Sequence, residues 1–92
     1  MPVRYTKAYL DKLESVFASS AYHLRYEKGS FKSGYCILNE NKIVIVNKYY
    51  TLEGKINTLL DILKELDLDP ASVSDKKLQA FLSEIKQTVL KL

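Results

Sequence analysis

Three short segments between residues 22 and 48 constrain the fold more than any other part of the chain, because together they carry apolar side chains for two faces of a sheet. In the first segment, apolar Tyr22, Leu24 and Tyr26 alternate with polar residues, which is the period of a strand with one buried face. The third segment is apolar throughout residues 43–46. The pattern predicts a three-stranded antiparallel meander over residues 22–28, 31–39 and 42–48, packed on helices.

Two turn sequences set the expected pairing of these strands. Gly29-Ser30 suits a two-residue hairpin turn with glycine first, and the polar residues 39–42 suit a second turn. The first turn predicts the pairs Tyr26–Ser33, Leu24–Tyr35 and His23–Cys36. The second turn predicts the pairs Leu38–Ile43, Ile37–Val44 and Cys36–Ile45.

This register sorts the side chains onto two faces of the sheet, because directly opposed residues point the same way. One face is expected to lie on the core and carries Tyr22, Leu24, Tyr26, Tyr35, Ile37, Val44 and Val46. The second face is half polar and half apolar. Its polar half carries His23, Arg25, Glu27 and Lys32, and its apolar half carries Cys36, Leu38, Ile43 and Ile45.

Helices are expected on both sides of the sheet segment in the chain. Apolar side chains recur at helical spacing over residues 6–19, 52–66 and 75–91, with Thr51 as a favourable N-cap for the second helix. The predicted fold class is therefore α+β, in the order α-β-β-β-α-α. At 92 residues the chain is expected to form a single domain, residues 1–92.

The third helix leaves two alternatives open. It could fold over the second sheet face, or it could pack beside the second helix and leave that face to a partner. Because an exposed apolar patch usually marks an interface, we expect a homodimer with two-fold symmetry. The predicted interface residues are Cys36, Leu38, Ile43 and Ile45, and the predicted function is a non-enzymatic binding or assembly module.

A nucleic-acid-binding domain is the alternative function. The chain has a net charge of +3 and seven tyrosines, and basic side chains can pair with phosphates while tyrosine rings stack on unpaired bases. Three of these tyrosines fall on the expected core face, away from the basic residues. The predicted polyanion-binding residues are Arg25, Lys28, Lys32 and Lys48.

Catalytic and metal-binding patterns are weak. The predicted register places the only histidine, His23, beside the only cysteine, Cys36, and such a pair can form a reactive thiolate. No third orienting residue or oxyanion-binding loop accompanies them, and a lone strand cysteine is more often a small buried apolar residue. A zinc site needs three or four such ligands. We therefore expect no enzyme, no metal and no cofactor.

The predicted location is a bacterial-type cytoplasm. The N-terminal residues 1–5 contain no apolar signal region, and no apolar run approaches the ~18–20 residues of a membrane span. A single cysteine cannot form an internal disulfide, which fits a reducing compartment. We accordingly expect no membrane partner.

Two resemblances accompany these patterns. The order helix, three antiparallel strands, helix over residues 6–66 resembles the double-stranded-RNA-binding domain, which implies RNA binding. That family has a Gly-Pro-x-His loop where this chain has residues 28–31 (Lys-Gly-Ser-Phe), and a lysine cluster where this chain has Lys55. The run from Leu24 to Cys36, followed by Asn47, is similar to small bacterial proteins of no assigned function and implies no activity.

Overall fold

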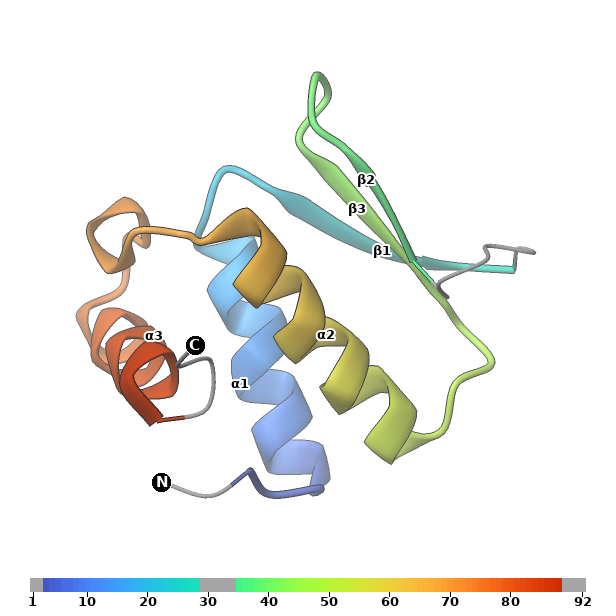
Figure 1. The fold of residues 1–92 in the computed structure, drawn as a ribbon, viewed down its shortest axis with the longest axis horizontal. Coiled ribbons are helices and arrows are strands. Elements are labelled where there is room, and N and C mark those ends of the chain that lie inside the picture. The colour runs from blue at the N-terminus through green and yellow to red at the C-terminus, as the bar shows by residue number, and fades with distance from the viewer. Residues whose placement is uncertain (1–2, 29–34, 89–92) are drawn as a thin grey trace.

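The computed structural model describes residues 3–28 and 35–88. Its elements in chain order are helix α1 (Lys7–Ala18), strands β1 (His23–Glu27), β2 (Tyr35–Leu38) and β3 (Ile43–Asn47), helix α2 (Leu52–Leu66), the 3-10 helix η1 (Pro70–Ser72) and helix α3 (Lys76–Thr88) (Figure 1). The α+β class and the predicted order of elements are confirmed. The first predicted turn, Gly29-Ser30, and the predicted end of the third helix lie outside the described residues.

The sheet is mixed, so the prediction of an antiparallel meander is wrong. Strand order is β1-β3-β2, with β1 parallel to β3 and β2 antiparallel to β3. The predicted partners of β1 are therefore wrong as well. Leu24 lies opposite Val44 instead of Tyr35, and Tyr26 lies opposite Val46, while Ser33 lies outside the described residues.

The apolar character of β3 explains why it takes the central position. Its sequence Ile-Val-Ile-Val-Asn places apolar side chains on both faces, and a central strand has neighbours that shield both. The alternating β1 carries polar side chains on one face, which an edge strand tolerates. Placing β1 beside β3 therefore shields more apolar surface than a meander with β3 at the edge would.

The second turn and its register are confirmed. Leu38 lies opposite Ile43, Ile37 opposite Val44, and Cys36 opposite Ile45. Lys42 closes the turn with a left-handed φ of 55°. This pairing was predictable because a short turn fixes the register of the strands it joins.

Helices α1 and α2 cover one face of the sheet, which we call the core face (Figure 1). The residues predicted for it are confirmed, because Val44 and Val46 are fully buried and the others pack partly buried against the core. Each helix begins at a threonine N-cap: Thr6 accepts a hydrogen bond from the Tyr9 N–H, and Thr51 accepts one from the Gly54 N–H. Largest among the fully buried side chains are Phe17, Leu13, Ile56, Leu59, Ile62, Leu63, Leu82 and Ile85.

Helix α3 packs against α1, apart from the sheet (Figure 1). The Phe81 ring meets the Tyr9 ring edge to face, with centroids 5.5 Å apart. The connection from α2 is held by Lys86, whose Nζ lies 2.8 Å from an Asp67 carboxylate oxygen. Since α3 lies against α1, it does not cover the second face of the sheet.

Candidate functional site: the outer face of the sheet

The side of the sheet opposite the core face, which we call the outer face, carries three rows of side chains. Parallel pairing of β1 with β3 and antiparallel pairing of β2 with β3 align these rows across the strands. The first row is His23, Ile43 and Leu38. The second is Arg25, Ile45 and Cys36, and the third contains Glu27 and Asn47.

The predicted interface residues therefore form one apolar cluster over β3 and β2. Leu38 is 39% exposed, and Cys36, Ile43 and Ile45 are partly buried. Among the described residues, no helix lies over this side of the sheet (Figure 1). The structure thus brings the four residues together on a face that the described chain leaves open.

The β1 side of the outer face is charged. Arg25 and Glu27 form an ion pair with 2.9 Å between Nη2 and Oε2, and both side chains are substantially exposed. His23 is exposed in the first row, beside Ile43. The outer face therefore presents an apolar strip next to both signs of charge.

The predicted polyanion-binding residues lie in two places. Arg25 is in the ion pair on the outer face, whereas Lys28 and Lys48 follow directly after the parallel strands β1 and β3. The Lys48 N–H donates to the Glu27 carbonyl at 3.1 Å, so the two lysines leave the sheet at the same end. Tyr49, 67% exposed, lies there under the Lys48 ammonium group, while Lys32 is outside the described residues.

The predicted pairing of His23 with Cys36 is wrong. His23 lies opposite Ile43 and Cys36 lies opposite Ile45, so β3 separates the two strands that carry them. Strand spacing in a sheet is ~4.8 Å, which puts residues on β1 and β2 ~10 Å apart. A thiol and an imidazole at that separation cannot share a proton.

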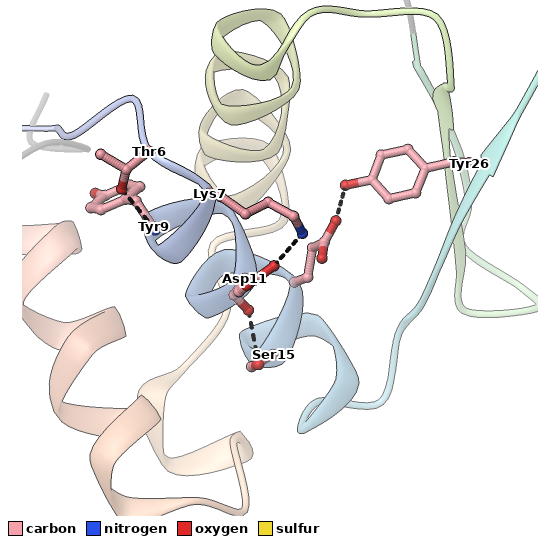
Figure 2. Close-up of polar contacts among 7 residues, drawn as sticks. Thr6, Lys7, Tyr9, Asp11, Ser15 and Tyr26 are labelled. Carbon is pink, nitrogen blue, oxygen red and sulfur yellow. Dashed lines mark hydrogen bonds and ion pairs between the residues drawn. The ribbon is translucent and has the colours of Figure 1, made fainter.

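Sequence reasoning missed a contact on the other side of β1. The Tyr26 hydroxyl donates a 2.5 Å hydrogen bond to Oε2 of Glu14, joining β1 to α1 (Figure 2). Burial, followed by this hydrogen bond and the Glu14 charge, raises the pKa of Tyr26 well above its ordinary value of 10.0. Glu14 flanks the apolar stripe of α1, but its position beside the stripe does not indicate that Tyr26 is its hydrogen-bond partner.

Two further findings bear on the kind of site. Within residues 3–28 and 35–88, no group of three or more His, Cys, Asp or Glu side chains is arranged to hold a metal ion. Over the same residues, no helix combines the length and the apolar composition that a membrane span requires.

Comparison of the chain with protein-family models, curated proteins and solved structures finds no match in any of the three. The resemblances to RNA-binding domains and to small bacterial proteins therefore remain predictions from the sequence. The antiparallel meander that carried the first resemblance is replaced by a mixed sheet.

Proposed function

We propose that this protein is a non-enzymatic binding and assembly module that forms a homodimer through the outer face of its sheet. The observation that carries the proposal is the contiguous apolar cluster on that face. Its members are the predicted interface residues Cys36, Leu38, Ile43 and Ile45, paired across β2 and β3.

A second copy packed on this cluster would cover apolar surface on both molecules. Burying apolar surface contributes about 25 cal/mol per Å², so two such strips stacked face to face exclude water from both. Stacked sheets pack ~10 Å apart, a spacing that aliphatic side chains of this size fill. The cluster is therefore suited to sheet-on-sheet packing.

The charges beside the cluster favour a second copy as the partner. In a two-fold interface the same patch meets itself, so a patch of one charge sign would repel its copy. The outer face carries Arg25 and Glu27 together, and each copy can thus present the opposite charge to the other. A face with both signs next to an apolar strip is compatible with pairing to itself.

The proposal includes a bacterial-type cytoplasmic location and no catalytic role. Cys36, the only cysteine, is a free thiol, which suits a reducing compartment. Strand β3 lies between Cys36 and His23, so the one combination of a nucleophile with a general base that the sequence suggested is not formed.

The test is the solution mass of the protein, measured by light scattering over a dilution series, compared with that of Ile45→Asp. The proposal predicts a dimer that dissociates on dilution, and a folded monomer for the variant. Because Ile45 is partly buried in the central strand, Leu38→Asp at the exposed edge provides a second variant that removes the interface with less risk to folding. A wild-type monomer at all concentrations would overturn the proposal.

A second candidate function, polyanion binding, is favoured by the end of the sheet where Lys28 and Lys48 follow the parallel strands and the Lys48 ammonium group lies over the exposed Tyr49 ring. Two cations at one end of a sheet that also carries an exposed aromatic ring can contact a phosphate and a base of single-stranded nucleic acid. Fluorescence anisotropy with a single-stranded RNA oligonucleotide tests this candidate. Binding must weaken with rising salt and be lost in a Lys28→Gln, Lys48→Gln double variant.

A further inference from the structure

Strand β1 is an edge of the sheet, and two of its five residues point their backbone groups away from β3. The His23 N–H donates to the Lys42 carbonyl at 2.8 Å, and the Glu27 carbonyl accepts from the Lys48 N–H at 3.1 Å. Because the direction of these groups alternates along a strand, Leu24 and Tyr26 point their N–H and C=O groups to the open edge. In residues 3–28 and 35–88, no backbone group pairs with them.

A groove runs beside this edge, between β1 and α1. It has a volume of about 310 Å³ and lies mainly on the core side of the strand, although His23 of the outer face also contributes to its lining. Ala18 of α1 contributes only a methyl group to it, which leaves space for a side chain from outside. The lining residues are Glu14, Ala18, Tyr22, His23, Leu24 and Tyr26.

The groove contains a carboxylate that forms no ion pair among the described residues, although the nearby Lys7 ammonium group interacts with it electrostatically. Asp11, one turn earlier on α1, is paired with Lys7 at 2.7 Å (Figure 2). Glu14 instead accepts the hydrogen bond from Tyr26 and has no lysine or arginine within ion-pair distance in the described part of the chain. A carboxylate has about four lone-pair sites, so Glu14 can still accept from a cation.

Two tyrosine rings of the groove already contact lysine side chains of the same chain. The Lys42 ammonium nitrogen lies 5.1 Å from the Tyr22 ring centroid, and the Lys55 ammonium nitrogen lies 5.1 Å from the Tyr26 centroid. These distances are typical of cation–π contacts. The lining combines one carboxylate with aromatic and aliphatic surface, which can contact the charged end and the alkyl chain of a basic side chain.

We propose that the open edge of β1 and this groove bind an extended peptide segment of another protein, with a lysine or arginine side chain placed against Glu14. The segment adds a strand to the sheet, and its backbone pairs with the outward groups of Leu24 and Tyr26. Every second side chain of an added strand points to the helix side, where the groove lies. Backbone pairing supplies affinity, and the basic side chain supplies selectivity.

This site is independent of the proposed dimer. The dimer uses the outer face of the sheet, centred on the apolar cluster of β2 and β3, whereas the peptide uses the backbone edge of β1 and the groove beside α1. A Leu38→Asp monomer is therefore expected to bind the peptide as the wild type does. Failure of one proposal leaves the other unaffected.

The first experiment measures binding of a fluorescein-labelled peptide, Thr-Val-Thr-Lys-Thr-Val-Thr, by fluorescence anisotropy. A matched peptide with glutamate in place of lysine is expected to bind at least about tenfold more weakly, because it loses a charge-assisted contact and gains a repulsive one. In Glu14→Gln the difference between the two peptides should largely disappear. Glu40→Gln makes the same substitution in the β2–β3 turn and is the matched control. This variant should keep the difference in affinity between the two peptides.

The second experiment tests strand addition directly. Two further peptides carry backbone N-methyl groups on alternate residues, one on the odd-numbered and one on the even-numbered residues. Only the peptide whose methylated amides face β1 should fail to bind. Amide hydrogen exchange should show new protection at Leu24 and Tyr26 in the complex, with no change at Arg25, which already faces β3. The proposal is overturned by the absence of saturable binding, by equal binding of both N-methylated peptides, or by amides of Leu24 and Tyr26 that are protected without peptide.

Discussion

The Tyr26 hydroxyl donates a 2.5 Å hydrogen bond to the Glu14 carboxylate, and this contact joins an edge strand to the helix beneath it. Tyr26→Phe removes the donor and leaves the ring. Since the acceptor is charged and the contact partly buried, we expect unfolding free energy to fall by about 1–2 kcal/mol. Urea denaturation of the variant measures this loss. Tyr49→Phe, at a ring that is 67% exposed, is the control and should change stability very little.

Stability should decline at alkaline pH. Burial and the neighbouring Glu14 raise the pKa of Tyr26 above its ordinary value of 10.0, so the unfolded state loses this proton at a lower pH than the folded state does. The contribution of protonated Tyr26 to the free energy of unfolding is therefore complete below pH 10.0 and is lost as the pH rises further. Denaturation curves at several pH values between 8 and 11 measure the decline, which should be smaller in Tyr26→Phe. An equal decline in the wild type and in Tyr26→Phe would contradict the attribution of the alkaline loss of stability to Tyr26.

The position of β3 between β1 and β2 predicts the outcome of a cysteine substitution. In His23→Cys, the new thiol and Cys36 lie on strands two spacings apart, ~10 Å, whereas a disulfide needs Cα atoms within about 7 Å. We expect no internal disulfide after mild oxidation. Mass spectrometry of the non-reduced monomer checks this. An internal disulfide would instead support the antiparallel pairing of β1 with β2.

The start of α2 offers a test of coupling between two neighbouring residues. Gly54→Ala should stabilise the helix by up to about 1 kcal/mol, since glycine is a poor helix former. However, the added methyl carbon would lie 3.3 Å from the Thr51 side-chain oxygen that caps the helix. The gain should therefore be larger in a Thr51→Ala background, although loss of the cap itself costs about 1 kcal/mol. Urea denaturation of the four proteins measures the coupling, and equal gains in both backgrounds would contradict it.

Local sequence patterns were sufficient for much of this fold. The bounds of α2 and its Thr51 cap followed from an apolar stripe and a capping residue, and the register of β2 with β3 followed from a short turn. The division of side chains between the two faces also held although the partner of β1 was wrong. Alternation along a strand decides which way a side chain points, whatever strand lies beside it.

Contacts between elements that are far apart in the chain were harder to predict from sequence. The neighbour of β1 depends on which strand gains most from a central position, and the unbroken apolar run of β3 was the available signal. The location of α3 depends on which of several apolar surfaces fits its stripe, and the stripe itself does not specify one. The contact of Glu14 with Tyr26 joins residues on two elements, so it follows only once α1 and β1 are placed together.

The central claim, that the outer face holds two copies together, is tested most directly by two matched substitutions. Leu38 and Leu52 are 39% and 37% exposed, but only Leu38 lies on the outer face. Light scattering over a dilution series should give a dimer for wild type and for Leu52→Asp, and a folded monomer for Leu38→Asp. The same mass for both variants, whether dimeric or monomeric, would contradict the claim.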